Sequence, residues 1–463
     1  MLSPRRPVAG LLVTVLISLV PVLCPALRAA ETVPDDMALP RAEVPDAQNA
    51  LVRWRAHFPA LQPGNDGISG LLIDHLSPLR PAVADPDALL WLDGVRPIIG
   101  ELGLRDGEVL QLPRIEGPDT PFPDHAPLYQ VAVIRANLAR RAWAAGDRPG
   151  ALKLARENLD FARAFLRAQE GVIAMIKASG VWQVSLDTVY WLARQPLTAD
   201  EAASLQADLE ADAALARETI ARGFRGEYTF FYKTVIGRMP QTRDADLLLS
   251  SLASLAMHPP TPVAPDEQHL ALPPEGREPL DREATLRAGA EDIRGYLRVI
   301  ERTGRFPRGY HTGHTAVALS AWLRELGGFY TYATDEGPFL PSVLAEANAA
   351  VLHSENPVGK LFLVLNTPQW EPLMVSIFRR EAQRAALAGM LAWRRNGQPA
   401  AWDVLVRKGL LAAEPVDPFG NGEPLRSDLQ KPRIWSVGID GVDNGGFGNG
   451  ENVGQPDDLV WPW

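Results

Sequence analysis

The sequence predicts a mainly helical protein that ends in a small module of mixed helix and strand. Apolar residues recur at helical spacing through much of residues 126–370, and turn residues separate the periodic stretches. From Glu371 onwards a long amphipathic stretch gives way to Gly/Pro turns, a short β-branched and aromatic run, and an acidic glycine-rich end. The 463 residues, 46% of them hydrophobic, can bury a large core and form two or three domains.

Residues 1–30 have the pattern of a secretory signal peptide. Arg5 and Arg6 precede an apolar run over residues 8–27, and Ala29 and Ala30 follow it. A basic start, an apolar centre and a small-residue exit are the parts of such a signal. The apolar run is also nearly long enough to span a bilayer, so an uncleaved anchor is the alternative. We expect cleavage, and a periplasmic or secreted protein that touches the membrane only if this segment stays uncleaved.

Composition excludes several kinds of site and partner. The only cysteine, Cys24, lies inside the predicted signal peptide, so the exported chain would have neither disulfides nor thiolate metal sites. Loss of Arg5, Arg6 and Arg28 with that segment takes the formal charge from −10 to −13. This acidic balance argues against nucleic acid as a partner. Stability must come from core packing, with a hard cation as a possible addition.

The helical body is predicted to begin after an irregular segment. Residues 31–125 are rich in proline, and we expect short helices there, with a helix, a turn and a possible strand over 85–112. Residues 126–257 should then form antiparallel helical hairpins. The first hairpin covers residues 129–167, with Gly146 and Asp147 at its turn.

Further helices are predicted on both sides of a proline-rich stretch. One helix is expected over residues 171–192 and another over 199–222, where Thr198 and Glu201 form a capping box. Residues 258–283 contain seven prolines and are predicted to be a loop or linker. The body should continue over 284–370, with helices at 285–302, 316–326 and 341–353.

The sequence contains no pattern from which a catalytic residue can be assigned. The stretch Gly67–Gly70 falls short of a G-x-S-x-G nucleophile elbow, and the glycines of 445–450 are not followed by the Lys-Ser/Thr of a phosphate-binding loop. His311 and His314 could present two imidazoles to a metal, but no third ligand lies nearby in the sequence. An enzyme is therefore unsupported rather than excluded.

The segment that begins at Asp417 carries turn, strand and acidic-loop signals in succession. Pro418 fixes its own φ, and Gly420 and Asn421 tolerate positive φ, so a tight turn is expected to lead into a strand over 433–438. No Lys or Arg follows Arg433, whereas glycines and oxygen-bearing side chains are frequent. Oxygen-only ligands select calcium, and the alternative is a solvated acidic loop without an ion. The acidic and amide residues of this loop are Asp440, Asp443, Asn444, Asn449, Glu451, Asn452, Asp457 and Asp458.

This C-terminal region, residues 371–463, resembles the globular domain of the type II secretion major pseudopilin and related pilin-like modules. The matching motifs are Asp417–Asn421 (DPFGN), Ser436–Gly441 (SVGIDG), Gly445–Gly446 and Asp457–Leu459, in the family's order. The resemblance implies a small α+β pilin-like module with a calcium ion in its C-terminal loop. It also implies the ligands, which are the carboxylates of Asp440, Asp457 and Asp458 and the carbonyl of Val437.

The chain departs from the family in two respects. Residues 422–426 replace the tyrosines that usually follow the first motif, and the acidic loop is longer than usual. The N-terminus has neither a prepilin peptidase site nor the glutamate of a filament-packing helix, so a standard filament subunit is excluded. We expect an exported, non-catalytic structural or binding protein with a calcium-stabilised end and an unidentified protein or envelope partner. The alternative is a periplasmic hydrolase with a site invisible in sequence.

The export hypothesis can be tested directly. We expect the protein from the periplasmic fraction to begin within a few residues of Glu31, because the basic, apolar and small-residue parts occur in the order that signal peptidase requires. N-terminal sequencing measures this. Intact Met1 in the membrane fraction would show that the segment is an anchor.

Overall fold

The computed structural model describes residues 35–39, 43–62, 66–77, 80–113, 125–229, 281–307, 356, 359, 370–446 and 458–463. This part of the chain is mainly helical and contains one small three-stranded antiparallel sheet, which confirms the fold class at that level. None of its helices is long and apolar enough to cross a membrane. Several predictions concern residues outside the described ranges. These are the signal peptide, residues 258–280 of the proline-rich stretch, His311, His314 and the helices expected at 316–326 and 341–353.

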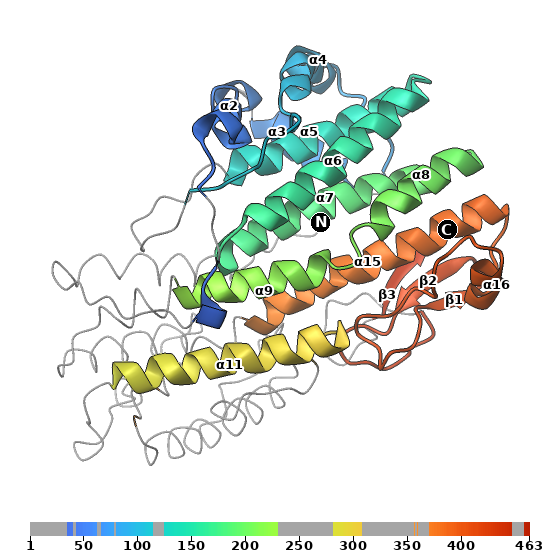
Figure 1. Ribbon diagram of the computed structural model, residues 1–463. Helices are drawn as coiled ribbons and strands as arrows, with labels where there is room; N and C mark the ends of the chain where they lie inside the picture. The colour runs from blue at the N-terminus through green and yellow to red at the C-terminus, as the bar shows by residue number, and fades with distance from the viewer. Residues whose placement is uncertain are drawn as a thin grey trace, which may run out of the picture.

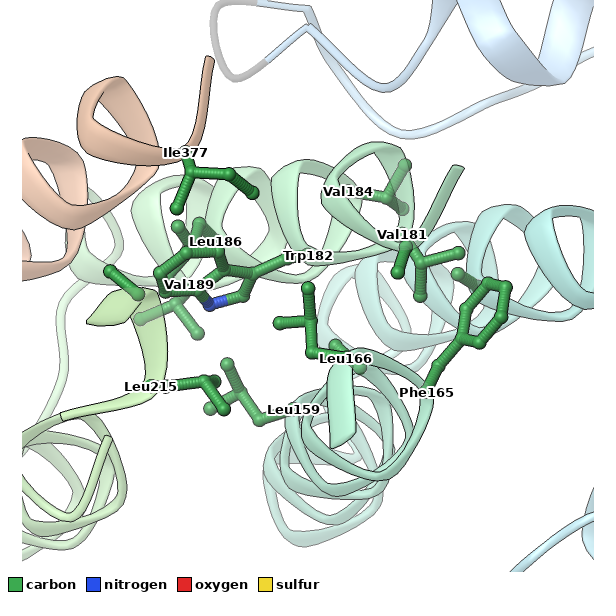
Figure 2. Packing of buried hydrophobic residues seen from close by; sticks show 14 of the residues in the cluster. Leu159, Phe165, Leu166, Val181, Trp182, Val184, Leu186, Val189, Leu215 and Ile377 are labelled. Carbon is green, nitrogen blue, oxygen red and sulfur yellow. The ribbon is translucent and has the colours of Figure 1, made fainter. Parts of the chain in front are cut away.

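Long helices that lie side by side form the body of the protein (Figure 1). They are α5 (His125–Ala144), α6 (Arg148–Ala168), α7 (Val172–Ala193), α8 (Ala199–Glu210), α9 (Leu215–Glu227), α11 (Arg282–Thr303) and α15 (Trp370–Asn396). α5, α6 and α7 pack against one another, α15 packs against α7, α8 and α9, and α9 also contacts α11. Figure 2 shows the buried Trp182 of α7 among aliphatic side chains, with Leu215 of α9 and Ile377 of α15 close by.

Local signals in the sequence correctly located the first hairpin. α5 ends at Ala144, Gly146 adopts a left-handed φ of 83°, and the Asp147 side chain accepts a hydrogen bond from the Gly150 backbone at 3.0 Å. A glycine with positive φ followed by an N-terminal cap reverses the chain within four residues. The expected helices at 171–192 and 285–302 are also confirmed, as α7 and α11.

The prediction of a single helix over 199–222 is wrong, because the chain forms α8 and α9 with a turn between them. The start is as predicted, since Thr198 and Glu201 form a reciprocal capping box. Asp212, only 2% exposed, interrupts the helix, and its carboxylate accepts hydrogen bonds from Arg163 of α6 at 2.5 and 3.1 Å. This ion pair joins residues 49 positions apart, so no local signal reports it.

Buried arginines of α5 hold the N-terminal segment in place. That segment contains α2 (Ala50–Arg55), α3 (Asp66–Asp74) and α4 (Pro86–Glu101), and the possible strand after α4 is an isolated bridge between Asn49 and Val109. Arg140 donates to the carbonyls of His75, Leu76 (2.6 Å) and Ser77 (3.2 Å), just beyond the end of α3. Arg135 donates to the Leu102 carbonyl at the end of α4, at 2.9 Å. Burial lowers the pKa of both arginines to about 10, so both stay charged at neutral pH.

The C-terminal segment shares its core with the helical body. Its first helix, α15, buries nearly all of residues 382–393, and α16 (Trp402–Arg407) follows after a turn at Gly397. The strands are β1 (Arg426–Asp428), β2 (Arg433–Ser436) and β3 (Leu459–Pro462), in the antiparallel order β1-β2-β3, with Trp435 opposite Val460. β2 and β3 both contact α15. One helix therefore packs against the bundle on one side and the sheet on the other.

We predict that replacing Arg140 with Met loosens the N-terminal segment. The change leaves carbonyl groups after α3 without their charged donor, which should lower the free energy of opening there by about 2–4 kcal/mol. Hydrogen exchange of the α3 amides should become roughly 30- to 1000-fold faster. The control is Arg96→Met, because Arg96 is 56% exposed and lies 3.7 Å from Asp93. Unchanged α3 exchange in Arg140→Met would show that packing alone holds the segment.

Candidate metal centre in the C-terminal module

A buried aspartate joins the two motifs of the C-terminal region. Asp417, in DPFGN, is 1% exposed. Its Oδ1 accepts hydrogen bonds from the Phe419 backbone at 2.9 Å and the Ser436 hydroxyl at 2.7 Å, and its Oδ2 accepts one from the Val437 backbone at 2.9 Å. Because Ser436 and Val437 begin SVGIDG, Asp417 fixes the turn to the end of β2.

The conformation of the DPFGN turn differs from the expectation in one detail. Gly420 and Asn421 do not take positive φ, whereas Gly422, just after the motif, does, at 98°. A side chain at Gly422 would also meet the guanidinium of Arg305. Phe306 donates its backbone N–H to the Pro418 carbonyl at 2.9 Å, so the turn lies against the end of α11.

The first half of the acidic loop is a series of glycine turns held by aspartates. Gly438, Gly441, Gly445 and Gly446 all have left-handed φ angles. Asp440 is exposed, and its Oδ1 accepts a hydrogen bond from the Val442 backbone at 2.8 Å. These glycines allow the backbone to reverse direction repeatedly, which is the flexibility that a calcium loop requires.

Asp443 supports the loop rather than remaining available to a ligand. Its Oδ1 accepts hydrogen bonds from the Trp435 indole at 3.0 Å and the Gly445 backbone at 2.9 Å, and Arg426 lies 3.3 Å from its Oδ2. Burial acts to raise the pKa of Asp443, but these hydrogen bonds and the Arg426 charge outweigh it and lower the pKa. Its omission from the predicted ligands therefore agrees with its contacts.

Asp458 is the most unusual carboxylate of the module. It is 2% exposed, and its Oδ2 accepts hydrogen bonds from the backbones of Asn444 at 3.1 Å and Gly446 at 2.8 Å. Its Oδ1 is buried and has no hydrogen-bond partner in the part of the chain that the structure describes. Burial raises the pKa of Asp458, and the two backbone hydrogen bonds together with the side chain of Asn444 offset part of that rise.

Two of the four predicted ligands, Val437 and Asp458, flank the paired ends of β2 and β3, where Ser436 lies opposite Leu459. Val437 follows β2, Asp440 lies in the next turn, and Asp458 immediately precedes β3, whereas Asp457 lies outside the described residues. Among the residues that can be placed, no three His, Cys, Asp or Glu side chains form a metal-binding group. The oxygen donors fit a hard cation, and the Oδ1 of Asp458, which has no donor among the described residues, has the chemistry of a ligand atom.

Other acids, each partly buried, form contacts within or between helices. Asp187 of α7 accepts hydrogen bonds from Gln183 at 2.6 Å and from Gln383 of α15 at 2.8 Å. Glu227 of α9 accepts one from the first backbone N–H of α7 at 3.1 Å, and burial raises its pKa to about 7. Glu381 pairs with Arg384 at 2.7 Å within α15. Each carboxylate has its own local partner, so these acids have structural roles in the bundle.

A surface hollow of about 410 Å³ lies beside α6 and the start of α8. Its charged residues form ion pairs with helical neighbours, such as Lys153 with Glu157 at 3.8 Å and Arg156 with Asp208 at 3.2 Å. Paired charges along helix faces account for this hollow without a ligand. Its lining consists of Pro149, Leu152, Lys153, Arg156, Glu157, Asp160 and Glu201.

Asp417→Asn should destabilise the C-terminal module. The amide NH₂ group would face the Val437 N–H, so a buried donor would lose its acceptor, at a cost of about 1–3 kcal/mol. The midpoint of thermal unfolding should fall. Asp403→Asn is the matched control, because it removes the same charge from a half-exposed side chain on α16. Equal midpoints for the two variants would contradict the structural role of Asp417.

Comparison of the chain with family models, with curated proteins and with solved structures gives no match. The pseudopilin resemblance therefore rests on the motifs alone, and the function has to be argued from the site.

Proposed function

We propose that the chain is an exported structural or binding protein whose C-terminal loop is ordered by calcium. The observation that carries the proposal is the carboxylate of Asp458, which is buried, oriented by two backbone N–H groups, and left with one unpaired oxygen among the described residues. A buried carboxylate with an unpaired oxygen is costly unless a cation or a further donor reaches it. Its place in an acidic, glycine-rich loop favours a cation.

Calcium suits the donors better than other ions do. It takes six to eight oxygen ligands in a flexible arrangement and accepts backbone carbonyls beside carboxylates. Asp458 and Asp440 would supply carboxylate oxygens, Asp457 a third, and Val437 a carbonyl. The guanidinium of Arg433 donates to the carbonyls of Gly445 and Gly446 at 2.9 and 2.8 Å and so fixes the base of the loop. A calcium ion would supply the positive charge that the rest of the acidic loop lacks.

A calcium ion at this loop would fasten the C-terminal strand to the helical body. Tyr190 of α7 donates its hydroxyl to the Pro462 carbonyl at 2.8 Å, and the Trp463 ring lies 5.5 Å from that of Trp393. Arg394 of α15 lies over the Trp463 ring, 4.6 Å from its centroid. Because Asp458 immediately precedes this strand, holding its carboxylate holds the strand. The ion would therefore be structural, and the helical body would present the surface for a protein or envelope partner.

Calcium should raise the midpoint of thermal unfolding, because an ion that binds only the folded loop stabilises it by about 2.7 kcal/mol at a hundredfold excess over its dissociation constant. Magnesium should substitute poorly, since it requires a compact octahedral site.

Asp458→Asn should abolish most of the calcium effect, and in chelator it should be at least as stable as the wild type. The amide oxygen can still accept from Asn444 and Gly446, while the buried charge is gone.

The controls separate this site from general charge effects. Asp440→Asn should weaken the calcium response, whereas Asp403→Asn, on α16, should leave it intact. Melting curves that coincide in calcium and in chelator would overturn the metal proposal. A full calcium response in Asp458→Asn would show that the ion binds without this carboxylate.

A further inference from the structure

A short N-terminal arm lies against helices that are distant from it in sequence. Asp35–Met37 forms a 3-10 turn, η2, seen in dark blue beside α9 and α11 (Figure 1). Arg294 of α11 donates from Nε and Nη2 to the two carboxylate oxygens of Asp36, at 2.6 and 2.9 Å. Arg225 of α9 donates to the Asp36 backbone carbonyl at 3.1 Å. Two helices therefore hold one residue by its side chain and by its backbone.

The next residue of the arm is held by burial. Met37 is 0% exposed and belongs to the hydrophobic core, whereas the side chain of Asp36 is 56% exposed. A bidentate guanidinium–carboxylate pair fixes orientation, and a buried apolar side chain supplies most of the attraction. An acidic residue followed directly by an apolar one is thus recognised through two different interactions.

The two arginines are positioned by neighbours that do not belong to the arm. Arg294 also hydrogen bonds to Glu291, one turn earlier on α11, and Arg225 lies 3.7 Å from Glu301. The guanidinium of Arg294 holds the pKa of Asp36 below its usual range. Because these pairs lie within α11 or join it to α9, they can keep the arginines oriented when the arm is absent.

We propose that this surface is a peptide-binding site, which the chain's own residues 35–39 fill. We call it the arm site. It consists of Arg225, Arg294 and the position in the hydrophobic core that the side chain of Met37 fills. Its ligand is a short peptide in which an acidic residue precedes an unbranched apolar residue. The tethered arm occupies it at a high effective concentration, so a peptide from another chain can bind only when the arm has left.

The test vacates the site by one substitution in the full chain. Asp36→Lys places a positive charge against Arg294 and should release the arm, which hydrogen exchange of residues 36–39 would show as roughly tenfold or greater acceleration. A fluorescent peptide of residues 31–39, ETVPDDMAL, should then bind to the variant and not to the wild type. The same peptide with Asn for Asp36 and Gln for Met37 should bind about tenfold more weakly or worse. Fluorescence anisotropy measures both.

A second substitution distinguishes the arm site from other surfaces. Adding Arg294→Gln to Asp36→Lys should abolish peptide binding, whereas adding Arg298→Gln, one turn further along α11, should leave it unchanged. The proposal is overturned if the arm of Asp36→Lys stays protected from exchange. It is also overturned if the arm is released and the peptide still does not bind. If Asp36→Lys does not fold, Arg294→Gln alone in the full chain should accelerate hydrogen exchange of residues 36–39. Unchanged exchange of those residues in Arg294→Gln would then overturn the proposal.

Discussion

The fold depends on guanidinium groups that reach the carbonyl ends of neighbouring helices. The last turn of a helix leaves carbonyl groups without partners, and a buried helix end must find donors elsewhere. In this chain arginines from adjacent helices supply them, and they also complement the negative end of the helix dipole. The pairs are Arg135 with the end of α4, Arg140 with that of α3, Arg222 with that of α6, Arg394 with that of α7, and Arg384 with that of α8. Each pair ties the end of one helix to the side of another, so these charges fix the relative positions of the helices.

Because these contacts join residues that are distant in the sequence, only some parts of the fold could be predicted from the sequence. Local signals were sufficient for the hairpin at Gly146 and the cap at Thr198, because the residues that make those contacts lie within four positions of one another. The break at Asp212 and the docking of residues 43–113 were missed, because they depend on Arg163 and Arg140 from distant helices. A buried arginine looks like a surface residue in sequence, since its burial follows from a carbonyl that only the fold supplies.

The same division applies to the C-terminal module. The motifs located the turn, and the strand expected over 433–438 is present as β2, but neither β1 nor β3 was predicted. The role of Asp417 was missed, because its partners Ser436 and Val437 lie 19 and 20 positions away in a second motif. Asp443 looked as suitable a ligand as Asp440 on composition alone, and its indole partner on β2 gives it a structural role. Residue type is enough to suggest an ion, but only the contacts separate a supporting carboxylate from a liganding one.

The contrast between two buried aspartates of this module is the strongest argument for a bound cation. Asp417 and Asp458 are 1% and 2% exposed and lie in the same module. Asp417 has donors on both oxygens, so its charge is fully solvated by the protein. Asp458 has donors on one oxygen alone in the described chain, although elsewhere the fold supplies donors even to distant helix ends. The second oxygen is buried without a donor in that part of the chain, so it is the atom through which the proposed cation would bind Asp458.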